Sequence, residues 1–167
     1  MKKLLIGAAV LVGASLTHSM NAQAASTNGT ANAKVIAGLT ITAGANLNFG
    51  TIAPSAVAGT VVISPAGARS ATLGAGLVTD GANAPTAGVF TVTGATGYPV
   101  SITLPVTATI TSGANNMTVG TFLATPVNPV PIVAGTATIN VGATLNVGAN
   151  QVAGSYTGTY PVSVNYN

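Results

Sequence analysis

The chain has 167 residues, of which 48% are hydrophobic, 4% aromatic and 3% charged, and it contains no Cys. Four Lys or Arg residues stand against one acid and give a formal net charge of +3. So small a charge cannot neutralise a run of phosphates or hold the chain at an anionic lipid surface, so the composition excludes nucleic-acid binding and electrostatic membrane binding.

The N-terminus has the pattern of a secretory signal. Lys2 and Lys3 precede an apolar run from Leu4 to Leu16, and a polar stretch then ends in small residues at Ala24. The apolar run is shorter than the roughly 20 residues that a membrane-spanning helix needs. The pattern therefore predicts cleavage after Ala24 and export to the periplasm, the cell surface or the medium. It also predicts no stable membrane insertion of the mature chain.

After the predicted signal, hydrophobic residues recur every two positions, and no window shows a helical repeat. We interpret residues 25–32 as a flexible segment and residues 33–167 as one domain. Short β-branched runs between Gly, Asn and Pro turns predict about 8 to 10 antiparallel strands in a sandwich or barrel. The internal runs are Gly59–Ser64, Gly88–Gly94, Tyr98–Leu104, Val106–Thr111, Met117–Leu123 and Thr136–Val147.

Two segments near the ends of the mature chain show strong alternation. The first has an apolar residue at every second position: Ala33, Val35, Ala37, Leu39 and Ile41. The second presents one face with Gly154, Tyr156, Gly158, Tyr160, Val162, Val164 and Tyr166. Pro161 lacks an amide donor, which indicates a sheet edge along part of this second segment. A long apolar edge strand needs a cover, and another subunit is one candidate.

The only acid of the chain has a predicted partner. Gly74–Gly76 predicts a hairpin turn that brings Ser70 opposite Asp80. This pairing leaves Arg69 close enough to Asp80 for a structural ion pair, and surface pairs of this kind contribute little stability.

Few side chains in the mature chain are suited to catalysis or metal binding. The single His, His18, lies in the predicted signal, and Asp80 is the only carboxylate. Carboxylate pairs, Ser-His-Asp and Cys-His arrangements and zinc sites all need groups that are missing here. A Ser–Lys arrangement through Lys34 and a calcium site through Asp80 are formally open. We expect no enzyme activity, cofactor or metal.

The C-terminal alternation, with its penultimate Tyr166, is similar to the C-terminal motif of chaperone-usher pilus subunits. The resemblance implies an incomplete immunoglobulin-like sandwich that a neighbour's N-terminal strand completes. It identifies the alternating residues of Ala33–Ile41 as the candidate donor strand. It also identifies Gly154, Tyr156, Tyr160, Val162, Val164 and Tyr166 as the candidate assembly strand, which would pair with a periplasmic chaperone. Many such subunits carry a disulfide, whereas this chain has no Cys.

A second resemblance covers nearly the whole mature chain. Several stretches in order resemble the secreted bacterial family called domain of unknown function 4402: Leu47–Gly50, Ile63–Ser70, Phe90–Gly94, Ile102–Pro105, Val141–Leu145, Ala153–Tyr160 and Val164–Asn167. The resemblance implies an exported, pilin-like antiparallel β-sandwich with no established activity to carry over.

Together these observations favour a non-enzymatic exported structural protein, a pilin-like or surface-assembly subunit that uses strand addition. Its partners are then other copies of itself or a periplasmic chaperone, bound through the terminal strands. The alternative is a monomeric secreted adhesin that binds a glycan or matrix component through its loops. That alternative requires the Ala33–Ile41 strand to pair within its own chain.

Overall fold

The period-two pattern of the sequence is realised as β-structure throughout the computed structural model, which describes residues 24–167. The predicted signal lies outside the described residues, except for Ala24. Within residues 24–167 no helix is long and apolar enough to cross a membrane. The described part of the chain forms nine strands: β1 Thr40–Ala43, β2 Ile52–Ile63, β3 Arg69–Leu77, β4 Gly88–Thr93, β5 Val100–Thr103, β6 Thr107–Ser112, β7 Asn115–Thr125, β8 Thr136–Val147 and β9 Ser163–Tyr166.

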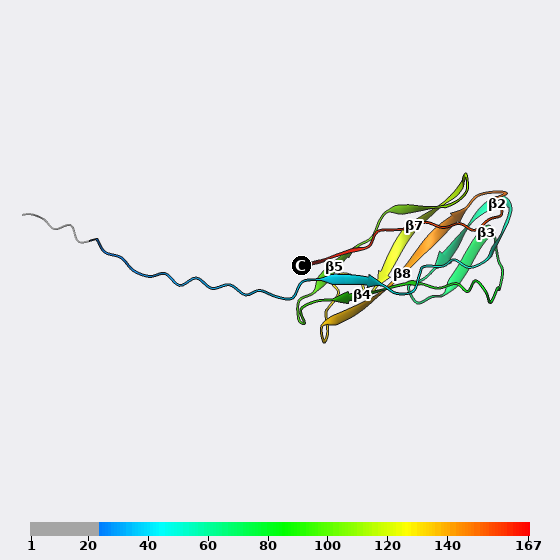
Figure 1. Cartoon of the computed structure of the whole chain (residues 1–167). Helices are drawn as coiled ribbons and strands as arrows, with labels where there is room; N and C mark the ends of the chain where they lie inside the picture. The colour runs from blue at the N-terminus through cyan, green and yellow to red at the C-terminus, as the bar shows by residue number, and fades with distance from the viewer. Residues whose placement is uncertain (1–23) are drawn as a thin grey trace, which may run out of the picture. The chain divides into compact units, whose positions relative to one another are not determined.

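Strand β8 organises a seven-stranded antiparallel sheet and lies between β7 and β2 (Figure 1). On one edge, its first half pairs with β4, so that Val141 lies opposite Gly88. Its second half pairs with β2, so that Ala143 lies opposite Ile63. Its other edge pairs with β7. The sheet continues with β1 beside β4, β3 beside β2 and β6 beside β7.

Gly142 lies at the position where β8 changes partner from β4 to β2. It is buried, and a Cβ atom there would lie 2.3 Å from the carbonyl oxygen of Ile63 and 2.7 Å from the nitrogen of Pro65. The backbone of β2 therefore approaches β8 so closely that the position has room only for glycine.

A second layer covers one half of the large sheet. It consists of the antiparallel pair β5 and β9, and Val130 bridges to Val100 of β5. The inward side chains of the two layers meet in a core of seven buried residues: Val92, Val100, Ile102, Val130, Ile132, Ile139 and Val141. The fold is therefore an antiparallel β-sandwich.

The other half of the sheet has a separate core cluster, built on Val61, Val119 and Leu145. The residues that pack over it include Phe49, which is buried, and Tyr156. Both residues come from segments outside any strand. Irregular backbone, and not a β-strand, thus lies over this part of the sheet, and the groove described below forms here.

The first strand begins later than the alternation predicts. Strand β1 starts at Thr40, opposite the last residue of β4, Thr93. Beyond this point the Gly94 N–H bonds to the carbonyl of Gly135, on the β8 side, and the Ala95 N–H bonds to the hydroxyl of Tyr166 in place of another strand. Residues 33–39 therefore have no neighbouring strand to pair with and stay outside the sheet.

The predicted hairpin at Gly74–Gly76 is wrong. These residues lie inside β3, which pairs with β2 after a turn near Gly67. The glycines have another purpose, because β2 bulges between Pro54 and Gly59. At Gly74 a Cβ atom would overlap the backbone of Val57 in this bulge. A close backbone approach, and not a turn, explains the glycine.

Candidate functional site

A groove with a volume of about 1180 Å³ lies against the inner face of the large sheet. Its floor includes Phe90 of β4, Val119 of β7 and Leu145 of β8, and its sides are residues 43–54 and residues 151–160. The floor is apolar because alternate residues of each strand face the same side of the sheet. The groove is therefore a place where one strand of the second layer could lie.

Both sides of the groove present backbone groups without strand partners. Between residues 152 and 162, only Thr157 makes backbone-to-backbone hydrogen bonds, and both go to Thr111. Across the groove, residues 44–48 bond to residues 86–89 along one edge only. Unpaired N–H and C=O groups along an extended segment form a template for another strand.

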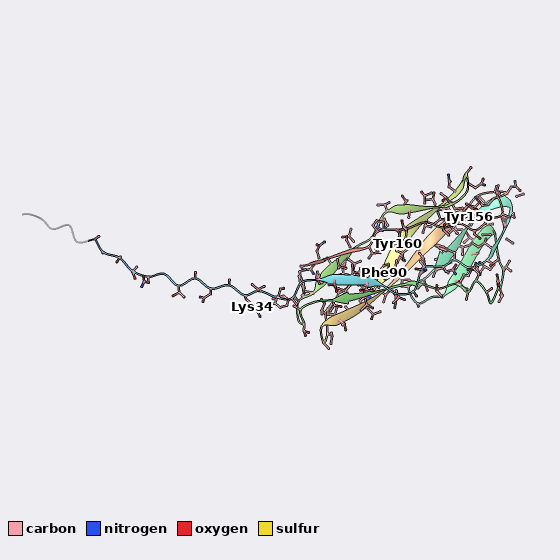
Figure 2. All side chains as sticks on the ribbon, viewed as in Figure 1. Lys34, Phe90, Tyr156 and Tyr160 are labelled. Atoms are coloured by element: carbon pink, nitrogen blue, oxygen red, sulfur yellow. The ribbon has the colours of Figure 1, made fainter. Side chains whose placement is uncertain are left out.

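The Tyr160 side chain joins the groove to the covered half of the sandwich. Figure 2 labels Tyr160 and Phe90 on the sandwich. The Tyr160 ring packs edge-on against Phe90 and tilted against Phe122, with centroids 6.0 and 5.1 Å apart. Burial raises the pKa of the Tyr160 hydroxyl by desolvation. Within the described part of the chain this hydroxyl has no hydrogen-bond partner. The neutral phenol thus offers both a donor and an acceptor to anything that enters the groove.

Tyr156 holds the same side of the groove in place. Its hydroxyl donates to the carbonyl of Val152 at 2.7 Å and accepts from Nε2 of Gln151 at 2.8 Å. Gln151 also donates to the carbonyl of Asn116 and accepts from the N–H of Gly148, each at 3.2 Å. Because the Tyr156 ring packs on the core, these bonds anchor the irregular segment to the sheet.

A polar cluster holds the opposite side of the groove. Nδ2 of Asn48 donates to Oδ1 of Asn83 at 2.8 Å. The Thr51 hydroxyl donates to Asp80 at 3.0 Å and accepts from Nδ2 of Asn83 at 3.3 Å. These bonds fix the backbone on both sides of Phe49 and so keep its ring in the core.

The two residues of the predicted ion pair meet at Thr51. Arg69 donates to the carbonyl of Thr51 and, at 3.1 Å, to that of Val78. Asp80 accepts from the Thr51 hydroxyl and from the N–H of Ala82, each at 3.0 Å. In the part of the chain described here, no hydrogen bond joins the Arg69 and Asp80 side chains. Burial lowers the pKa of Arg69, and its Nε has no partner.

The residues of the predicted donor strand lie in different environments in the structure. Ala33 and Val35 are exposed, Val35 to 95%. The carbonyl of Ala37 accepts a hydrogen bond from the penultimate tyrosine at 2.8 Å, and Leu39 packs on the core. Ile41 lies in β1, paired with β4 of the same chain. Only the first part of the predicted donor therefore lies outside the sandwich.

The predicted C-terminal assembly strand is regular only at its end, in β9. Tyr166 is the last residue of this predicted strand. Its hydroxyl accepts from the N–H of Ala95 at 2.6 Å and donates to the carbonyl of Ala37. Gly154 is exposed, and the other predicted residues are half-buried toward the sandwich: Tyr156, Tyr160, Val162, Val164 and Tyr166. The alternation thus predicts the orientation of the side chains, although most of the segment has no strand partner.

Sequence reasoning did not identify the phenylalanines as groove residues. The chain has only three Phe, and all three line the groove: Phe49, Phe90 and Phe122. The signal that could have found them is their size, because large aromatic side chains bury more apolar area than most residues and dominate cores and interfaces.

The groove is lined almost entirely by uncharged residues. Of the described residues that line it, only Asp80 is charged. Residues 24–167 contain no group of three or more His, Cys, Asp or Glu side chains that could hold a metal ion. The groove can bury small apolar groups, bond to a peptide backbone along its sides and pair with one cation.

The outer face of the large sheet is polar and regular. Three neighbouring strands place exposed threonines opposite one another in two rows: Thr42, Thr91 and Thr138, and Thr40, Thr93 and Thr136. A third row crosses five strands: Thr72, Thr60, Asn146, Thr118 and Thr109. Neighbouring strands lie about 4.7 to 4.9 Å apart in the hydrogen-bonding direction, and this spacing separates the backbones of the residues in each row.

Comparison with known proteins assigns the sandwich to a family. The sequence matches the family described as Domain of unknown function (DUF4402) over residues 39–166. The chain belongs to this family. The DUF4402 resemblance predicted from the sequence is thereby confirmed, and the match includes both sides of the groove and all three Phe residues. No curated protein and no solved structure matches the chain.

The DUF4402 match begins at Leu39, where the chain joins the sandwich core, and ends at Tyr166. Residues 24–38 lie before the matched region. The family therefore accounts for the groove, whereas the N-terminal segment must be interpreted from its own residues.

Proposed function

We propose that this DUF4402 protein is a non-enzymatic exported structural subunit, pilin-like in its use of strand addition. A strand of a partner polypeptide enters the groove and pairs with its sides. The observation that carries this proposal is the combination of an apolar floor with two sides whose backbone groups lack strand partners.

The groove meets both requirements of β-strand addition. Main-chain hydrogen bonds supply affinity in this binding mode, and pockets for alternate side chains supply specificity. The segments at residues 44–48 and 152–162 offer the backbone groups, and the half-buried side chains of Phe90, Ile110 and Phe122 offer the apolar surface. An inserted strand would also reach the partnerless hydroxyl of Tyr160.

We infer export from the N-terminal sequence pattern, which predicts the periplasm, the cell surface or the medium as the location of the protein. Low charge suits a subunit that packs against copies of itself, because little electrostatic repulsion opposes association. Before assembly, a periplasmic chaperone would cover the same unpaired segments through the C-terminal strand.

A second candidate function is that of a monomeric adhesin. Two observations favour it: Ile41 pairs with Val92 within its own chain, and the outer face carries rows of hydroxyl side chains. Hydroxyl and amide groups without charge suit hydrogen bonding to a neutral glycan. Binding of a neutral polysaccharide by a strictly monomeric protein would favour this candidate over strand addition.

Strand addition can be tested by placing a large side chain in the groove, where it would block an inserted strand. Ala153 is exposed and lines the groove, so Ala153→Trp places an indole in the path of the inserted strand. Ala149→Trp is the matched control, because Ala149 is exposed in the same region but does not line the groove. Overpacking costs about 1 to 3 kcal/mol, so we expect the groove variant to associate about tenfold more weakly.

Light scattering after size-exclusion chromatography measures the association, and urea unfolding of each variant checks that the sandwich is intact. The wild-type protein and Ala149→Trp are expected to form oligomers at equal concentration. A wild-type protein that stays monomeric at every concentration and binds no added strand peptide would overturn the proposal.

A further inference from the structure

Three neighbouring strands carry the same pattern, Thr-x-Thr, on the outer face of the large sheet. The pattern occurs once in each of β1, β4 and β8, and β4 lies between the other two. The register places the six threonines opposite one another, and all six are exposed. We call these residues the threonine array. Its first row is Thr40, Thr93 and Thr136, and its second row is Thr42, Thr91 and Thr138.

The array is more uniform than strand formation or solubility requires. Strand propensity would equally accept valine or tyrosine at these positions. Solubility would favour charged side chains on an exposed face. Strands β1, β4 and β8 nevertheless contain no charged residue. One uncharged group repeated in two directions matches a ligand that is itself uncharged and repeats in space.

The spacing within a row is close to that of waters in a tetrahedral network. Directly opposite residues of an antiparallel pair have Cβ atoms about 4.5 to 5.5 Å apart. Hydrogen-bonded oxygen atoms of hydroxyl groups or waters are about 2.75 Å apart, so two waters that share a tetrahedral neighbour lie about 4.5 Å apart. A row of threonine side chains can therefore hold a row of waters at the separation that they have in ice.

We propose that the threonine array binds ice and that the protein slows the growth of ice crystals. Each hydroxyl donates one hydrogen bond and can accept two, as a lattice water needs from its neighbours. The array lies on the outer face of the sheet, whereas the groove lies against the inner face. The inference therefore goes beyond strand addition and applies equally to a monomer and to an assembled subunit.

Threonine suits such a surface because its side chain is stiff. The β-branch restricts rotation about χ1, so a threonine in a strand has few arrangements to lose. Ordering a side chain on binding costs free energy, and this cost is smaller for a stiff side chain than for a long flexible one. A lysine at the same position would also hold its own strongly bound hydration water. The array thus presents its hydroxyls at low cost.

Sheet twist confines the proposed site to these three strands. Neighbouring strands are rotated by roughly 20 to 25° relative to each other, so a wider surface departs further from a plane. The third polar row crosses five strands and has Asn146 in its middle. It is less uniform than the array and spans more twist. We therefore assign ice binding to the six threonines alone.

Thermal hysteresis, the gap between the melting and freezing temperatures of an ice crystal in protein solution, tests the inference. We expect it from the chain without the predicted signal. Thr91→Tyr places a ring in the middle of a row, in a residue type that strands accept, and is expected to abolish the gap. Thr42→Tyr is expected to do the same from the edge strand β1. The matched control is Thr103→Tyr, exposed on β5 in the other layer, which should keep the wild-type gap.

Urea unfolding of each variant confirms that only folded chains are compared. A wild-type protein without thermal hysteresis at any soluble concentration would overturn the inference. Hysteresis that survives both substitutions in the array would show that the array is not the site. Binding to cellulose or chitin powder without an effect on ice would also overturn it, and would favour the adhesin that binds a neutral glycan. Light scattering on the same samples reports assembly separately, so either proposal can fail while the other stands.

Discussion

Tyr156 and Tyr160 show how two tyrosines four residues apart serve different purposes. The hydroxyl of Tyr156 makes two hydrogen bonds within the fold, whereas that of Tyr160 makes none with the described residues. At neutral pH we therefore expect Tyr156→Phe to lower the free energy of unfolding by about 1 to 2 kcal/mol. We expect Tyr160→Phe to change it by less than about 1 kcal/mol. Urea unfolding measures both.

The raised pKa of Tyr160 adds a pH dependence to this pair of variants. Its ordinary value is 10.0, and burial raises it in the folded protein. Above pH 10 the unfolded chain loses this proton before the folded chain does, so folding stability falls as pH rises through that range. Tyr160→Phe removes this contribution, and its unfolding free energy should fall less steeply above pH 10 than that of the wild type. Equal slopes would contradict the assignment.

At the residue scale, the sequence identifies which side chains make polar contacts better than it identifies their partners. Arg69 and Asp80 are identifiable because charges are rare in this chain. Their connection through Thr51 could not be predicted, because it depends on where β3 ends and on how the Asn83 loop folds back. Hydrogen bonds between residues far apart in the sequence depend on tertiary structure and have no local signature.

At the scale of elements, the contact of β8 with both β4 and β2 depends on Gly142. We expect Gly142→Ala to lower the free energy of unfolding by about 3 kcal/mol, because its Cβ atom would meet backbone that has no space to move. Gly81→Ala is the control, since nothing lies within 4 Å of the added atom. It is expected to stay within about 0.5 kcal/mol of the wild type in urea unfolding. A tolerated alanine at position 142 would show that β2 and β8 can separate.

Period two predicts β-structure and the inward face correctly, but it does not predict where a strand finds a partner. Val162, Val164 and Tyr166 are half-buried as the alternation predicts, yet only β9 is paired. Glycine is ambiguous for a related reason. Gly74 looks like a turn residue locally, and its purpose becomes clear only when the bulge of β2 at Val57 lies over it.

At the scale of the whole sandwich, the two halves of the large sheet are covered differently. β5 and β9 cover one half with a paired layer, whereas irregular segments and a groove lie over the other. The family match spans both halves, so the groove belongs to the DUF4402 region itself. An added strand would extend the second layer over the half that the chain's own strands leave uncovered.

Two N-terminal deletions separate a segment used for assembly from one used for folding. Deleting residues 25–35 removes only exposed residues, so we expect an unchanged urea midpoint and a loss of oligomers in light scattering. Deleting residues 25–43 also removes β1, the Leu39 side chain and the Ala37 carbonyl that Tyr166 bonds. Burial of one leucine alone contributes about 1.5 to 3 kcal/mol, so the longer deletion should lower the free energy of unfolding by at least about 3 kcal/mol.

A peptide spanning residues 25–35 provides the complementary measurement on the shorter deletion. It should raise the urea midpoint of that variant, because a strand that binds only the folded sandwich stabilises it by mass action. If the shorter deletion still assembles, the N-terminal segment is not the donor. If it unfolds, the segment belongs to the sandwich, and the monomeric binding module becomes the better account of the groove.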